Sequence, residues 1–171
     1  WIFDRIGTIS PAALAQQLIA SLELPPPGVT MTPDPYQTSQ AHSATIGLPI
    51  WMWVLDPSTI ETRADAEMAG TLEVSIEAVP THIEWTMGDG TVIECPIDAP
   101  GWDPALGVAE SPSCGHTYQQ TSAGQPDERY EVVARAYYTV TWTAGSMSGE
   151  QEIAPFSTFQ VPVTEMQVNV R

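Results

Sequence analysis

Apolar and polar residues alternate along three stretches of the chain, and each stretch predicts a β-strand. In residues 71–79 the even positions are apolar and most odd positions are acidic or hydroxylated. Residues 82–87 continue the alternation with apolar residues at odd positions. A period of two residues is that of a strand with one buried face. The longest stretch, 130–143, gathers its apolar residues on one side: Tyr130, Val132, Ala134, Ala136, Tyr138, Val140 and Trp142.

Turn signals and apolar runs complete the strand pattern. The sequence Gly88-Asp89-Gly90 predicts a tight turn between two strands, the second at 91–95. A dense apolar run at 46–55 predicts a strand covered on both faces. The polar and acidic residues 56–70 predict a loop, and 153–170 predict a last strand or strand pair. Strands of this kind without interleaved helices predict a mainly β fold, an antiparallel β-sandwich.

A helix is predicted at residues 10–22, before the strands begin. Ser10 suits the N-cap, and Pro11 suits the first helical position because its φ is fixed near the helical value. Three leucines recur every four residues and make one apolar stripe: Leu14, Leu18 and Leu22. Two destinations for this stripe are open at this point. It packs on the chain's own sandwich, or it docks into a neighbouring subunit or larger assembly.

A proline-rich segment separates the helix from the strands. Residues 25–45 hold five prolines and show no period, so they predict a linker or extended arm. We therefore expect two parts, an N-terminal helix and arm at 1–45 and a β-sandwich at 46–171. The chain begins with Trp1, and we expect a processed or trimmed product, with an upstream signal or anchor left open.

The two cysteines predict a disulfide. Cys95 and Cys114 stand 19 positions apart, outside CxxC spacing, and no histidine completes a zinc site with them. The alternative is two buried free thiols. A disulfide would close the proline-rich loop between the cysteines and would indicate an oxidising compartment, hence a secreted or cell-surface protein.

Charge excludes several classes of partner. The chain has 21 acidic and 5 basic residues, a formal net charge of −16, and every basic residue is an arginine. Such a chain is repelled by nucleic acid and by anionic membrane surfaces. No apolar run reaches the ~20 residues that a membrane-spanning helix needs. Because there is no lysine, Schiff-base and P-loop chemistry are excluded as well.

Few residues have a pattern that predicts chemistry. Asp89 is a catalytic or calcium-binding carboxylate, or a turn residue that bonds nearby amides. His116 and Tyr118 form an acid/base pair or serve the structure. A calcium site near Asp98 and Asp103 is an open alternative, although no EF-hand pattern is present. No Ser/His/Asp or Cys/His constellation is recognisable, so we expect neither an enzyme nor a cofactor.

Trp102 is the most prominent single residue outside the strands. It lies in a loop rich in proline and glycine. Such a tryptophan is an exposed anchor for a sugar or a protein partner, or it fills the end of the sandwich.

Three motifs together resemble the PKD (polycystic kidney disease) domain, an immunoglobulin-like β-sandwich. They are Trp85-x-Met followed by the Gly88-Asp89-Gly90 turn, then His116-Thr-Tyr118, then Tyr130-x-Val. The resemblance covers roughly residues 70–143. It implies a structural corner in which the Tyr118 hydroxyl ties a loop to a strand. The long loop before His116 and the helix and arm depart from the PKD pattern, so no ligand site is carried over.

The whole chain also resembles a set of exported PKD-domain proteins of high-GC Gram-positive bacteria. The shared features are the leader helix, the arm, a Gly47-Leu-Pro-x-Trp-x-Trp53 strand, a cysteine after the turn and a cysteine before His-x-Tyr. This resemblance implies export and carries no biochemical function with it.

We therefore expect a non-enzymatic extracellular module of cell-surface adhesion or assembly. Its helix and arm would contact a protein partner or further copies of itself. The alternative is a carbohydrate-binding module in which Trp102 and other loop aromatics stack on sugar rings.

Overall fold

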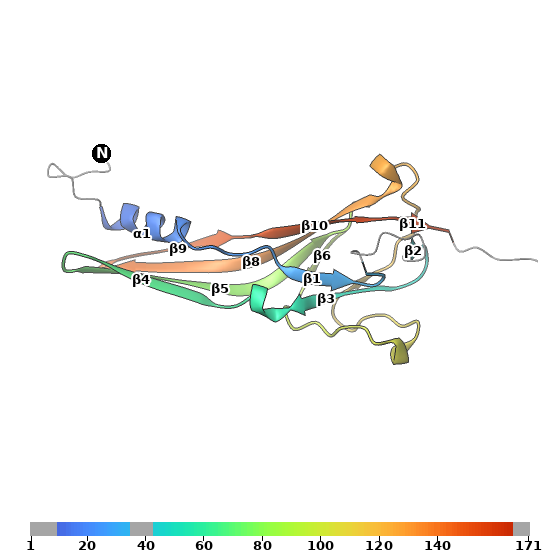
Figure 1. Cartoon of the computed structure of the whole chain (residues 1–171), viewed down its shortest axis with the longest axis horizontal. Coiled ribbons are helices and arrows are strands. Elements are labelled where there is room, and N and C mark those ends of the chain that lie inside the picture. Colours follow the sequence, from blue (N-terminus) through green and yellow to red (C-terminus); the bar gives the residue numbers. More distant parts are fainter. Residues whose placement is uncertain (1–9, 35–42, 166–171) are drawn as a thin grey trace, which may run out of the picture.

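The structure is an elongated, mainly β molecule with an α-helix near its N-terminal end (Figure 1). It is a computed structural model that describes residues 10–34 and 43–165. The helix is α1 (Pro11–Ala20), and three short 3-10 helices are η2 (Pro57–Thr59), η3 (Pro104–Leu106) and η4 (Pro126–Glu128). The strands are β1 (Gly28–Met31), β2 (Ala44–Thr45), β3 (Ile50–Asp56), β4 (Arg63–Ala69), β5 (Leu72–Thr86), β6 (Val92–Cys95), β7 (Gly115–His116), β8 (Tyr130–Ala144), β9 (Met147–Ile153), β10 (Phe156–Val161) and β11 (Val163–Thr164).

Two long antiparallel strands, β5 and β8, form the centre of a six-stranded sheet. On the outer side of β5, β4 pairs with its first half and β6 with its second half. On the outer side of β8, β10 pairs with its first half and β9 with its second half. The sheet is therefore four strands wide in each of its two halves, and Figure 1 shows how far the β4, β5, β8 and β9 half extends.

A bulge in the middle of β5 keeps one face of this sheet apolar. The register with β8 shifts between Pro80 and His82, which pair with Tyr138 and Tyr137. Thr81 is the extra residue, so the buried positions change from even before the bulge to odd after it. The apolar positions of β8 need no such change, and its even side chains are buried from end to end, as predicted.

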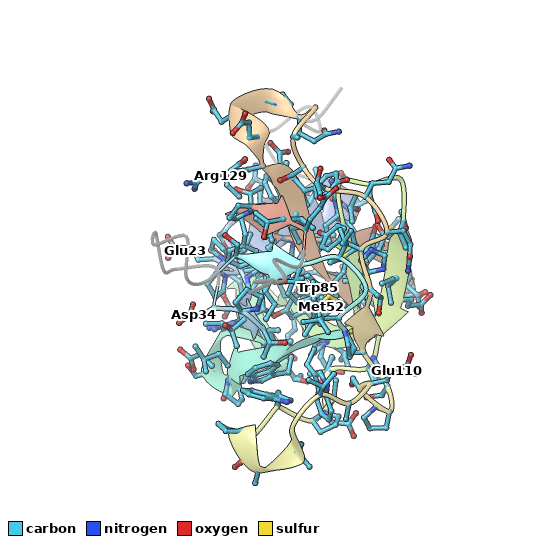
Figure 2. All side chains as sticks on the ribbon, turned by 90° about the vertical axis from the view of Figure 1, so that its right-hand side faces the viewer. Glu23, Asp34, Met52, Trp85, Glu110 and Arg129 are labelled. Carbon is cyan, nitrogen blue, oxygen red and sulfur yellow. A yellow bond between two sulfur atoms is a disulfide. The ribbon has the colours of Figure 1, made fainter. Side chains whose placement is uncertain are left out.

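The smaller sheets close the other half of the core. The strand order β1-β3-β7 forms a three-stranded antiparallel sheet, and β11 pairs with β2 in parallel. Met52 of β3 and Trp85 of β5 are both buried in one hydrophobic cluster. Figure 2 looks onto this end of the molecule and places both side chains near its middle.

Helix α1 packs on the extended half of the large sheet, against β4, β5, β8 and β9. The Ser10 hydroxyl caps it by accepting from the Ala13 amide, as predicted. Leu18 is 5% exposed, and Leu14 and Leu22 pack against the core. The chain's own sheet therefore occupies the apolar stripe, which is the first of the two destinations open from the sequence.

The prediction of a loop at residues 56–70 was wrong, and the segment predicted as a linker or extended arm at 25–45 contains a strand. Residues 56–70 contain β4, which is exposed on both faces and so needs no apolar alternation; its pairing with β5 makes it a strand. Within the predicted arm, Val29 and Met31 of β1 are buried in the common core, and β1 pairs with β3. Burial and pairing with distant strands override the irregular local pattern.

Replacing Leu18 tests whether the helix belongs to the fold. We expect Leu18→Ala to lower the free energy of unfolding by about 2–5 kcal/mol, because it leaves a cavity between α1 and the sheet. Gln17→Ala, an exposed position one residue earlier, should change it by less than about 0.5 kcal/mol. Urea denaturation followed by tryptophan fluorescence measures both. Equal stability of the two variants would show that α1 does not pack as described.

Candidate functional site

The turn that follows β5 places Asp89 beside backbone amides. Gly88 has a φ of +85°, and a Cβ on it would lie 2.7 Å from the Glu131 carbonyl oxygen. Only glycine fits this position without strain. The Thr91 amide donates to Asp89 Oδ1 at 3.0 Å. In the structure Asp89 therefore acts as a turn residue that bonds a local amide.

Asp89 also pairs with His116 of β7. Asp89 Oδ2 and His116 Nε2 lie 2.8 Å apart, and the two side chains are 17% and 11% exposed. The histidine ring packs edge-on against Tyr118, with 4.7 Å between centroids. The pair is thus enclosed between the turn and the β7 segment, and it joins them.

Tyr118 continues this cluster into the core. Its hydroxyl donates to the Met87 carbonyl at 2.7 Å, which links the segment after β7 to the end of β5. Its ring stacks on Tyr130, with centroids 4.8 Å apart. The Tyr130 hydroxyl in turn donates to the carbonyls of Gln120 and Thr121. The motif residues therefore meet at one corner, although they come from three separate segments.

The environment of this corner lowers the pKa of Asp89 and raises the pKa values of Tyr118 and Tyr130. Burial opposes ionisation of Asp89, but hydrogen bonds from His116 and Thr91 outweigh it and lower the pKa of the carboxyl. Burial raises the pKa of Tyr118, with a further contribution from the charge of Asp89. An ionised Asp89 and a neutral Tyr118 hold the corner together; neither shift provides an acid for catalysis near neutral pH.

The predicted disulfide is confirmed. Cys95 and Cys114 are bonded, with 5.3 Å between their Cα atoms, and both are buried. The Cys114 carbonyl accepts from the Met52 amide. The disulfide therefore fixes both ends of the loop 96–113 to the body of the molecule.

Trp51 attaches the middle of this loop to β3. Its indole N–H donates to the Ala109 carbonyl at 2.6 Å. Its backbone N–H donates to the Thr32 hydroxyl at 2.9 Å, and its carbonyl accepts from the Thr32 amide. One buried residue thus holds two distant segments at a fixed separation.

Between these segments lies an apolar cavity of about 300 Å³, which we call the Trp102 pocket. Its lining comprises residues 32–33, 43–45, 48–50, 102 and 107–109. Trp102 is half-buried, and its indole N–H donates to the Gly107 carbonyl at 3.0 Å. Val108, which also lines the pocket, is 76% exposed, and Leu106 beside it is 51% exposed. The Trp102 side chain is therefore neither fully buried nor freely exposed.

A more polar cavity of about 460 Å³ adjoins the Trp102 pocket. It is lined by residues 49–50, 93 and 110–117, so Pro49 and Ile50 belong to both. Its polar groups include His116, Ser111 and Thr117. The Ser111 hydroxyl accepts from the Cys114 amide, which gives it a structural role in this loop.

Away from the corner and the two cavities, histidine and acidic side chains come together less closely. His82 stacks on Tyr137 on the sheet, and its Nε2 lies 3.9 Å from Glu94. Asp103 Oδ1 caps η3 by accepting from the Ala105 amide. Across residues 10–34 and 43–165, no group of three or more His, Cys, Asp or Glu residues is arranged to hold a metal ion. In the same ranges, no helix has the length and apolar character needed to cross a membrane.

Comparison of the chain with family models, with curated proteins and with solved structures gives no match.

Sequence reasoning found Trp102 but missed the pocket around it. The lining comes from five segments spread over residues 32–109, and only the folded chain brings them together. One signal was present in the sequence: Leu106 and Val108 are apolar residues in a loop rich in proline and glycine. Apolar residues that a loop leaves exposed indicate a contact surface.

Removing the Tyr118 hydroxyl tests the corner. Tyr118→Phe leaves the buried Met87 carbonyl without its donor, so we expect the free energy of unfolding to fall by about 1–3 kcal/mol. Tyr137→Phe, on the partly exposed face of β8, should change it by less than about 0.5 kcal/mol. Chemical denaturation compares the two. Wild-type stability in Tyr118→Phe would contradict the described role.

The contact between Asp89 and His116 makes the free energy of unfolding depend on pH in the acid range. A carboxyl whose pKa is lowered by folding stabilises the fold above its unfolded pKa, about 3.9, and loses this effect as pH falls through the folded pKa. Asp89→Asn should therefore be less stable than wild type at pH 6, by about 1 kcal/mol. The gap should shrink as the pH falls from 5 towards 2.5. Urea denaturation across this range measures it, with the exposed Asp98→Asn as control. A gap independent of pH would exclude ionisation of Asp89 as its cause.

Proposed function

We propose that this chain is a non-enzymatic extracellular interaction module of the PKD-like sandwich class. It binds a protein partner through the Trp102 pocket. The observation that carries the proposal is the pocket itself: an apolar cavity bordered by exposed apolar residues and held open by hydrogen bonds from Trp51. Partly exposed tryptophans beside apolar pockets are frequent anchors of protein interfaces.

The arrangement of the sheets supports the PKD-like class. A large antiparallel sheet and a smaller one share a hydrophobic core, as the two sheets of a sandwich do. The residues of the PKD motif meet at one corner, where a tyrosine hydroxyl bonds a distant backbone carbonyl. Tyrosine corners of this kind occur in related sandwiches.

The disulfide supports an extracellular location. Disulfides persist in oxidising compartments. The Cys95–Cys114 bond is also buried, so a reducing thiol in solvent has poor access to its sulfur atoms. A fixed loop is also a suitable place for a contact surface, because little conformational entropy is lost when a partner binds.

The pocket replaces the helix as the contact surface of this proposal. The leucine stripe of α1 is occupied by the chain's own sheet. The Asp89 and His116 side chains are bonded to each other and serve the corner. The Trp102 pocket combines a mainly apolar lining with exposed apolar side chains beside it, which supports it as the contact surface.

A glycan ligand is the second candidate. The polar cavity beside the Trp102 pocket supports it, because a sugar would stack on the indole and bond to the hydroxyls of Ser111 or Thr117. The predominantly apolar lining of the Trp102 pocket itself fits a hydrocarbon side chain better than a hydroxylated ring.

Paired screens of the whole chain distinguish the two ligands. We expect a displayed random-peptide library to yield binders, and a glycan array to yield none. Trp102→Ala should weaken the selected peptides at least tenfold, since truncating a central tryptophan anchor costs about 2 kcal/mol or more. Met147→Ala, an exposed apolar residue in the distant β9, is the matched control and should bind as wild type does. Glycan binding that depends on Trp102 would support the second candidate and overturn the first.

A further inference from the structure

Acidic residues adjoin the lining of the Trp102 pocket in the sequence, and one of them, Glu110, lines the polar cavity beside it. Three of the segments that line it each carry an acidic residue directly beside a lining residue: Asp34 after Pro33, Asp103 after Trp102 and Glu110 after Ala109. All three acidic residues are exposed. Figure 2 looks onto this end of the molecule and labels Asp34 and Glu110, which lie on opposite sides of it. We call these three residues the acidic rim.

Positive charge is scarce in the part of the chain that the structure describes. The arginines there are Arg63 on β4, Arg129 before β8 and Arg135 on β8, and none of them lines the pocket. The full chain has no lysine. The rim therefore stands in the field of a strongly acidic chain, which attracts cations to this end and repels anions.

We propose that the partner is a basic protein segment with one large apolar side chain. The apolar side chain enters the Trp102 pocket, and flanking lysine or arginine residues lie against the acidic rim. This inference rests on the proposed function and gives its partner a chemical class. A cavity of about 300 Å³ lies at the lower end of ligand pockets, ~300–1,000 Å³, which fits one anchoring side chain.

Charge argues against a second copy of this chain as the occupant. Each of two copies would carry a formal net charge of −16 over its whole chain, and like charges oppose association. A neutral apolar segment would fill the pocket but would gain nothing from the rim. A basic segment satisfies both features.

The attraction between a basic segment and the acidic rim also predicts how binding responds to salt. Rim charges are exposed, so they act mainly on the association rate and are screened as ionic strength rises. The apolar contact in the pocket is not screened in this way. Affinity should fall with salt towards the level that the pocket alone supports.

The test is a selection of random displayed peptides against the whole chain at 50 mM salt, repeated with Trp102→Ala. We expect selected peptides with one leucine, phenylalanine or tryptophan flanked by lysine or arginine, and loss of binding in Trp102→Ala. Peptides that need Trp102 but carry no excess of basic residues would overturn this inference and leave the proposed function standing. A selection that yields no peptides, or peptides indifferent to Trp102, would overturn both.

Charge variants then test the rim directly with a selected peptide. Asp103→Asn with Glu110→Gln should weaken binding by roughly three- to tenfold at 50 mM salt and flatten the salt dependence. Asparagine retains the oxygen that caps η3, so the loop keeps its fold. Glu150→Gln with Glu152→Gln on the distant β9 removes the same charge and is the matched control. An equal loss of affinity in both double variants would assign the effect to net charge and contradict the proposed role of the acidic rim.

Discussion

The antiparallel pairing of β5 with β8 is the interaction on which the rest of this structure depends. Each strand is 15 residues long, and their ladder runs through both halves of the large sheet. Every outer strand of the sheet pairs with one of these two. An isolated pair of strands is at best marginally stable in water, so the ladder persists only because its apolar face is covered along its full length. Helix α1 covers one half, and the smaller sheets complete the core of the other.

The bulge at Thr81 makes this continuous covering possible. Without an extra residue, β5 would present Ile83 and Trp85 to solvent after burying Val74 and Ile76, because a one-residue difference in strand phase exchanges the two faces. The bulge keeps both groups on the same side as the even residues of β8. It therefore connects the half that holds the helix to the half that holds the turn, the disulfide and the pocket.

The sequence predicted what depends on local pattern and missed what depends on distant partners. The even face of β8 and the cap of α1 follow from spacing alone, and the structure has both. The stripe of α1 required an apolar cover, but nothing within the helix says which surface provides it. The strand character of β4 comes from its pairing with β5, since its own residues are exposed on both sides. The Trp102 pocket likewise cannot be recognised in any single segment, because its lining comes from residues far apart in the sequence.

The acidity of the chain has different consequences at its edges and at the pocket. The edge strands β4 and β9 carry Glu67, Glu150 and Glu152, and charged side chains on an edge oppose pairing with another sheet. Asp65 adds to this protection, because its carboxylate accepts from the Ala66 amide of the same edge strand. The long sheet is therefore closed to strand addition by a similarly charged chain. At the other end, acidic residues adjoin the segments that line an apolar cavity instead of standing on a backbone edge. There the same charge would favour a basic partner, so the acidity that opposes pairing at the sheet edges would also support the contact that we propose at the Trp102 pocket.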